Sequence, residues 1–147
     1  MYARATALLV VLALAVAGCG GGTDDVPAAS GDGSRVAAAT VLREAFTNVS
    51  AAADGLDTCG SRRCLRGMGR DLHAAADEAV SRLSEVDRRP LPACYADAIE
   101  QATRAMTAYR RAGIAFEGVD NAAAQAAIAR AGRFEAGVTR SIAACPA

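Results

Sequence analysis

The chain has few residues of the types that build catalytic and metal sites. It contains a single histidine, His73, among 147 residues. One imidazole cannot supply a His-x-x-x-His pair or the Glu-x-x-His motifs of carboxylate di-metal bundles. Gly-x-Ser-x-Gly and nucleotide-binding glycine motifs are also missing. We therefore expect a domain without metal, cofactor or catalytic activity.

Charge of one sign is not in excess. The chain carries no lysine, and its 16 basic residues, all arginines, balance 16 acidic residues. Nucleic-acid-binding domains usually concentrate positive charge, so we expect no nucleic-acid partner. The 38 alanines and the exclusive use of arginine are typical of a GC-rich genome, such as that of an actinobacterium.

Strand patterns are missing as well, because no stretch alternates apolar and polar residues with a period of two. Four stretches instead repeat apolar residues in steps of three and four, which predicts amphipathic helices at about 34–56, 65–86, 92–116 and 120–142. Ser34 suits the N-cap of the first, Pro92 the start of the third, and Asp120 or Asn121 the N-cap of the fourth. Similar lengths and short connections favour an all-α, antiparallel up-down-up-down four-helix bundle.

The N-terminal stretch has a different composition. One positive charge, Arg4, precedes the unbroken apolar run ATALLVVLALAVAG, which is too short for a comfortable membrane span. The run closes on the sequence VAGC at residues 16–19, which resembles the lipobox of bacterial lipoproteins. This resemblance covers only the first nineteen or so residues. It implies that residues 1–18 are a signal peptide and that a lipid on Cys19 anchors the protein in the bilayer, at the outer face of the cytoplasmic membrane.

After the signal, the sequence predicts two parts. Residues 19–34 begin with the lipid-bearing cysteine and are rich in glycine, serine and aspartate, which is typical of a flexible linker. Residues 35–147 contain the predicted helices and are long enough for one domain. Because Arg4 leaves with the signal, the mature chain holds fifteen arginines against sixteen acids, a net charge of −1.

The lipid anchor also accounts for the odd count of five cysteines. With Cys19 lipidated, four remain, and an even number in an exported domain indicates disulfides. Cys59 and Cys64 flank the first helix–helix connection, whereas Cys94 and Cys145 lie at the opposite end of an antiparallel bundle. A disulfide needs Cα atoms about 4.4–6.8 Å apart, which excludes pairs along the length of the bundle. The topology predicts the bridges Cys59–Cys64 and Cys94–Cys145.

Two other roles for Cys59 and Cys64 fit less well. Redox motifs place their cysteines closer together, usually at a helix start in a strand–helix–strand unit. A zinc site needs two further ligands nearby, and the other two cysteines are predicted at the far end. We therefore expect a structural bridge.

Four arginines crowd the start of the second predicted helix: Arg62, Arg63, Arg66 and Arg70. Positive charge is unfavourable there, because the helix dipole is itself positive at the N-terminus. Guanidinium groups beside free backbone N–H groups form a candidate anion or partner surface. The alternative, which we favour, is neutralisation by the nearby acids Asp54, Asp57 and Asp71.

The remaining polar and sulfur-containing residues suggest packing more than chemistry. His73 follows an apolar position by one residue, so we expect it on the flank of its helix in solvent. Tyr95, Tyr109, Met68 and Met106 recur at helical spacing, which is more typical of a core than of a cofactor pocket.

Two functions of different classes are consistent with this sequence. The first is a membrane-tethered, non-catalytic interaction or scaffold module of the cell envelope, with an envelope protein or an anionic polymer as its partner. The second is a helical carrier of haem or another small apolar ligand. We expect the first, because the alanine-rich helices should pack closely and leave little room for a ligand.

Replacing Cys19 by alanine should abolish the incorporation of labelled palmitate, because the lipobox resemblance makes this thiol the lipid acceptor. Metabolic labelling followed by immunoprecipitation of the chain measures it. A Cys59→Ala/Cys64→Ala variant keeps the lipobox and should remain labelled. Fatty-acid labelling of the Cys19→Ala chain would contradict the anchor.

Overall fold

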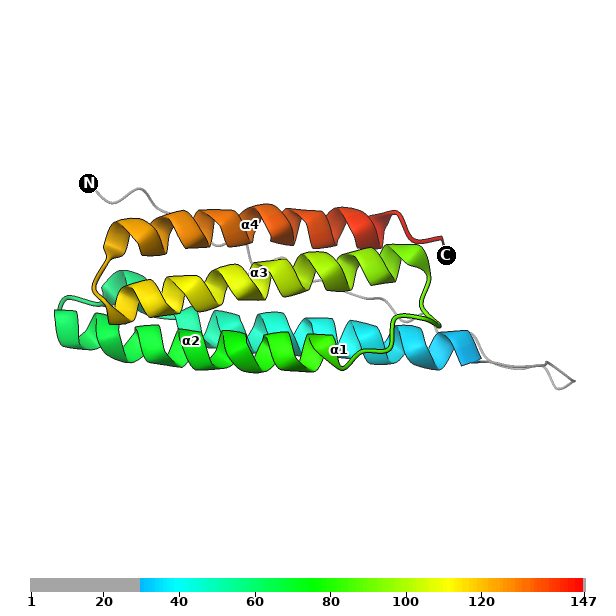
Figure 1. Cartoon of the computed structure of the whole chain (residues 1–147), viewed down its shortest axis with the longest axis horizontal. Coiled ribbons are helices and arrows are strands. Elements are labelled where there is room, and N and C mark those ends of the chain that lie inside the picture. The colour runs from blue at the N-terminus through cyan, green and yellow to red at the C-terminus, as the bar shows by residue number, and fades with distance from the viewer. Residues whose placement is uncertain (1–29, 147) are drawn as a thin grey trace, which may run out of the picture.

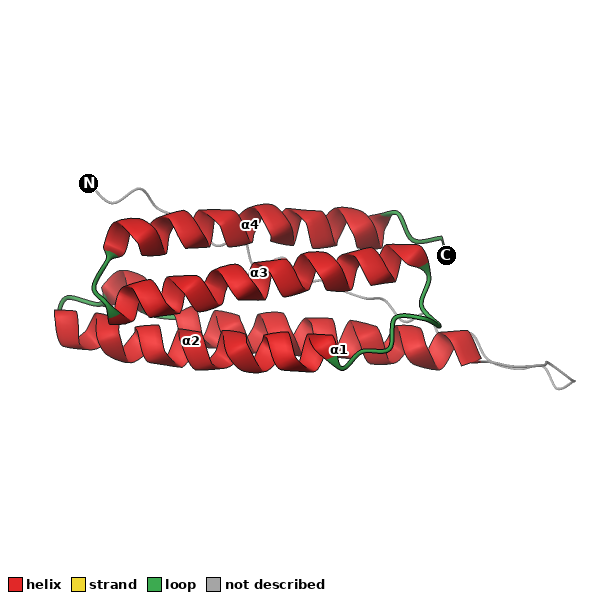
Figure 2. Cartoon of the chain, viewed as in Figure 1, coloured by secondary structure: helices red, strands yellow, loops and turns green. Residues whose placement is uncertain are grey.

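The structure, a computed structural model, describes residues 30–146, with side chains from Gly33 onward. Cys19, the predicted signal peptide at 1–18 and residues 19–29 of the predicted linker lie outside the described residues. The described part of the chain is all-helical (Figure 2). Its elements are α1 (Ser30–Ala53), the short 3-10 helix η1 (Leu56–Thr58), α2 (Arg62–Ser84), α3 (Ala93–Glu117) and α4 (Asn121–Ala143).

Successive long helices run antiparallel, so the predicted up-down-up-down four-helix bundle is confirmed (Figure 1). The third helix is the central one: α3 packs along α2 on one side and along α4 on the other. The first helix packs mainly on α2 and less on α3, whereas α4 packs almost entirely on α3. As a result, α1 and α4 form opposite edges of the bundle.

The helices α3 and α4 begin within one residue of the predicted starts, α2 begins at Arg62, three residues before the predicted residue 65, and the largest difference is at α1. This helix begins at Ser30, four residues before the predicted start, and Ser34 lies inside it instead of capping it. The glycines of this stretch weaken a helix but do not prevent one. Pro92, which was predicted to open the third helix, takes the N-cap position, and α3 begins one residue later at Ala93. The Asp120 side chain caps α4 by accepting a hydrogen bond from the N–H of Ala123 at 3.0 Å.

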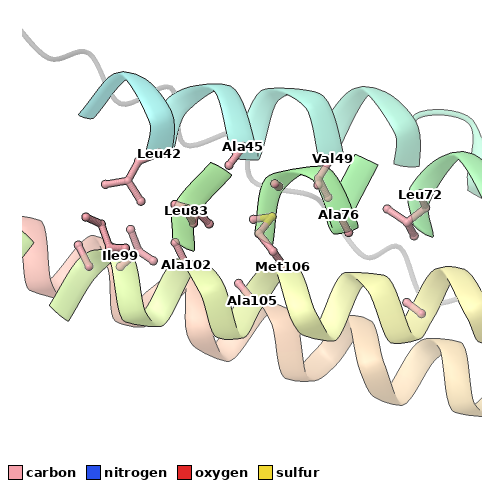
Figure 3. Close-up of a cluster of buried hydrophobic side chains, with 14 of the residues drawn as sticks. Leu42, Ala45, Val49, Leu72, Ala76, Leu83, Ile99, Ala102, Ala105 and Met106 are labelled. Atoms are coloured by element: carbon pink, nitrogen blue, oxygen red, sulfur yellow. The ribbon is translucent and has the colours of Figure 1, made fainter. Parts of the chain in front are cut away.

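The hydrophobic core lies mainly between α1, α2 and α3, and α4 adds the buried side chains of Ala124 and Val138 (Figure 3). Its largest fully buried side chains come from the first three helices: Val49, Leu72, Leu83, Ile99 and Met106. Alanines occupy most other buried positions, and on α3 these are Ala98, Ala102, Ala105, Ala108 and Ala112. Short side chains let helices approach closely, which is how a chain with few aromatic residues builds a dense core.

The second and third helices approach so closely that their backbones touch. A Cβ atom added at Gly69 would lie 2.8 Å from the carbonyl oxygen of Gly113 and 2.7 Å from the backbone nitrogen of Glu117. One added at Gly113 would lie 2.6 Å from the backbone nitrogen of His73. Side chains do not tolerate such distances to a backbone, so glycine is required at both positions. We call this contact the glycine crossing.

The fourth helix is held on α3 by close packing and one polar contact. Gly137 of α4 leaves room for the side chain of Gln101, which would lie 2.9 Å from a Cβ atom there. The hydroxyl of Tyr109 donates a hydrogen bond to Oε1 of Glu135 at 2.8 Å. Burial, together with the neighbouring carboxylate, raises the pKa of Tyr109 above its ordinary value of 10.0.

Both predicted disulfides are present and close opposite ends of the bundle. Cys59, which follows η1, bonds to Cys64 in the first turn of α2, with Cα atoms 5.6 Å apart. Cys94, in the first turn of α3, bonds to Cys145 just after α4, with Cα atoms 5.4 Å apart. The pairing deduced from the antiparallel topology is therefore confirmed.

Gly113→Ala should lower the free energy of unfolding by about 1–3 kcal/mol, because the added methyl group forces the backbones of α2 and α3 apart. Urea denaturation followed by circular dichroism gives the value. Gly132→Ala on α4 is the matched control, since no atom lies within 4 Å of a Cβ atom there. That variant should gain about 0.5–1 kcal/mol by removing a glycine from a helix. Equal effects of the two substitutions would contradict the glycine crossing.

The Tyr109–Glu135 hydrogen bond predicts a loss of stability in alkali. The folded state holds the phenol proton more tightly than the unfolded chain, so this contribution is complete below about pH 10 and is lost as the pH rises further. Tyr109→Phe should therefore flatten the decline in unfolding free energy above pH 10. Glu135→Gln should reduce the decline without removing it, because burial of the phenol remains. An unchanged pH profile in Tyr109→Phe would show that another group governs it.

Candidate functional site

The start of α2 is built by a cap and a covalent bridge. Ser61 precedes the helix in an extended conformation, and its Oγ accepts a hydrogen bond from the N–H of Cys64 at 3.1 Å. The bond from Cys64 to Cys59 ties the preceding segment to the same turn. Cap and bridge together fix the position from which the side chains of Arg62 and Arg63 project.

The structure brings the four arginines of the candidate surface together: Arg62, Arg63, Arg66 and Arg70. All four are exposed, and they line an open depression with Glu117 from the last turn of α3. Residues four apart lie on the same side of a helix, which gathers three of these side chains into one row. We call the four arginines and Glu117 the arginine surface. It lies at the end of the bundle where α1 connects to α2 (Figure 1).

The three acids expected to neutralise these arginines are not paired with them in the described part of the chain. Asp54, Asp57 and Asp71 are exposed, and within residues 30–146 none of them forms an ion pair. Helix geometry gives one reason: Asp71 follows Arg70 directly, and adjacent side chains diverge by about 100° around a helix. Direct ion pairs with these three acids, the form of neutralisation that the sequence suggested, are therefore not formed in the described residues.

Clustering, more than the lack of partners, distinguishes these arginines. Arg130, Arg133 and Arg140 on α4 also form no ion pair in the described part of the chain. Among the described helices, however, only α2 carries four arginines in one short stretch, residues 62–70. The first turn of α2 holds no acidic residue. This arrangement opposes the helix dipole. Residues that oppose such a local preference without a contact that offsets the cost are a sign of a functional surface.

His73 has a partner, contrary to the expectation of a solvated side chain. Its Nδ1 lies 3.0 Å from Oε1 of Glu117, and the two side chains are 39% and 34% exposed. The glycine crossing explains the contact, because it places the α2 backbone at His73 against α3 near Glu117. The carboxylate of Glu117 is thus held by His73, and no arginine of the surface lies within ion-pair distance of it.

Glu117 is the residue that sequence reasoning missed. The antiparallel topology carried a usable signal, since the last turn of the third helix must lie at the same end as the first turn of the second. The sequence does not indicate which side chain of that turn faces α2. That choice depends on the rotation of α3 about its axis, which the glycine crossing fixes.

A second open depression continues from the arginine surface along α2. It shares Arg70 and Glu117 with the first, and Asp77 and Glu78 add acidic side chains to its lining. Asp77 accepts a hydrogen bond from Arg110 of α3 at 3.1 Å. The face of the molecule therefore changes from strongly basic at the end of α2 to mixed charge toward its middle.

Comparisons with protein-family models, with curated proteins and with solved structures found no match. In residues 30–146, no group of three or more histidine, cysteine, aspartate or glutamate side chains is arranged to hold a metal ion. None of the helices in that range combines the length and the apolarity needed to cross a membrane.

Proposed function

We propose that the protein is a lipid-anchored module of the cell envelope that binds another envelope protein through the arginine surface. The observation that carries this proposal is the group of four exposed arginines on α2, none of which forms an ion pair within residues 30–146. Guanidinium groups form paired hydrogen bonds with carboxylates, so such a group suits an acidic patch on a partner. The module acts by binding and positioning, without catalysis.

The position of the arginine surface supports a partner away from the membrane. The proposed anchor, Cys19, precedes α1, and α1 begins at the end of the bundle opposite the arginine surface. A helix of 24 residues, the length of α1, spans about 36 Å. Electrostatic attraction to lipid headgroups decays within about 8 Å at physiological salt. When the protein is anchored through Cys19, its arginine surface faces components beyond the lipid surface.

The mixed charge around the arginines favours a protein over an anionic polymer. Glu117 lies within the arginine surface, and Asp77 and Glu78 border the adjoining depression. A uniformly anionic polymer would be repelled by these carboxylates, whereas a protein surface can present basic groups opposite them. The polymer remains an outcome that the binding experiment distinguishes.

The second function considered, a carrier of haem or another apolar ligand, has no specific observation in its favour. Apolar ligands require a pocket lined mainly by apolar side chains. The two depressions described above are open and lined largely by charged residues. Haemin titration followed at the Soret band tests this alternative directly.

Arg62→Ala/Arg63→Ala/Arg66→Ala should remove the partner recovered from envelope extract by the immobilised protein. Four cooperating arginines contribute both steering and contact energy, so losing three should weaken capture at least about tenfold. Quantitative mass spectrometry of the eluates, with and without nuclease and glycan hydrolases, separates a protein partner from a polymer. Capture by the wild-type protein should also fall as salt is added.

The control for this experiment is Arg130→Ala/Arg133→Ala/Arg140→Ala on α4, which makes the same change in net charge. It should retain the partner, because these exposed arginines lie on the opposite edge of the bundle from α1 and outside the arginine surface. If the two triple variants behave alike, net charge and not the arginine surface governs capture, and the proposal fails.

A further inference from the structure

The Cys59–Cys64 bridge is the more accessible of the two disulfides. Cys64 is exposed on the first turn of α2, and Cys59 is half-buried, with its Sγ 3.1 Å from Sδ of Met68. Cys94 and Cys145 are both half-buried. Residue exposure therefore favours attack by an external thiol at Cys64 over the other three disulfide cysteines of the described chain.

The surroundings of Cys64 stabilise a thiolate. The residue is the third of a 23-residue helix, where unpaired backbone N–H groups and the helix dipole favour negative charge. Arg62 and Arg63 immediately precede it, Arg66 follows two residues later, and the first turn contains no acidic side chain. Helix N-termini and neighbouring arginines are the two environments that most consistently favour thiolates in proteins.

The other bridge is coupled much more strongly to folding. Cys94 and Cys145 are 51 residues apart, and their bond joins the start of α3 to the end of α4. A disulfide that closes a long loop restricts the unfolded chain more than one that closes five residues. Because the long bridge stabilises the folded bundle more than the short one does, folding in turn makes the long bridge harder to reduce than the short one. The short bridge lies outside both the glycine crossing and the hydrophobic core.

We propose that Cys59–Cys64 is an exchangeable disulfide that reacts with the dithiol of a partner protein, while Cys94–Cys145 remains closed. The partner's thiolate bonds to Sγ of Cys64, and the electron pair of the broken S–S bond leaves on Sγ of Cys59, which takes up a proton. The second thiol of the partner then attacks the mixed disulfide and releases Cys64 as a thiolate. The partner's dithiol is oxidised to a disulfide, and this bridge gains two electrons. The inference does not rest on the proposed function.

The test measures each bridge separately in the folded, full-length protein. Oxidised protein is equilibrated with mixtures of reduced and oxidised dithiothreitol at pH 7, quenched with acid, alkylated and mapped by mass spectrometry. The four bridged cysteines lie in peptides that do not contain Cys19, so the lipidation state of Cys19 does not affect the mapping. The Cys59–Cys64 bridge should open at a ratio of reduced to oxidised reagent at least about tenfold lower than Cys94–Cys145 requires.

The arginines supply the second, independent readout. Arg62→Ala/Arg63→Ala/Arg66→Ala should raise the reagent ratio needed to open Cys59–Cys64 by about three- to tenfold at low salt, because the thiolate loses its neighbouring charges. The difference should shrink at high salt. Arg130→Ala/Arg133→Ala/Arg140→Ala should leave the ratio unchanged, and circular dichroism checks that both variants fold. Joint opening of the two bridges, prior opening of Cys94–Cys145, or an unchanged ratio in the first variant overturns the proposal.

Discussion

Backbone contact between α2 and α3 at Gly69 and Gly113 is the constraint on which the rest of this structure depends. Two helices that touch through their backbones cannot slide or rotate without collision, because no flexible side chain lies between them. The crossing therefore fixes the first turns of α2 against the last turns of α3. It brings His73 to Glu117, and Glu117 to the edge of the four arginines.

Around this fixed contact, the protein tolerates an arrangement that is locally unfavourable. Four arginines in the first turns of α2 repel one another and oppose the helix dipole. The Ser61 cap, the Cys59–Cys64 bridge and the glycine crossing with α3 hold the helix start in place regardless. The same charges that make the surface a candidate for binding also favour a thiolate at Cys64. One local electrostatic feature thus connects the proposed partner surface with the proposed exchangeable disulfide.

The fold could be predicted from the sequence, but the contacts between side chains of different helices could not. Helical spacing identifies four helices, and helix direction alone determines which cysteines can meet, so both bridges were predictable. The contact of His73 with Glu117 and the lack of an ion pair at Asp71 were not predictable, because each depends on the rotation of a helix about its axis. Gly69 and Gly113 set that rotation, yet a glycine inside a helical pattern looks the same whether it meets a backbone or, as at Gly67 and Gly132, open space.

The glycine crossing can be observed directly in solution. In an isotopically labelled sample, the α protons of Gly113 should show nuclear Overhauser effects to the amide and α protons of His73. These contacts join residues forty positions apart, and a Cβ atom at Gly113 would lie 2.6 Å from the nitrogen and 2.8 Å from the Cα atom of His73. Observing them would establish the contact that positions the arginine surface. Their absence, with both residues assigned, would contradict this account of the fold and of the site built on it.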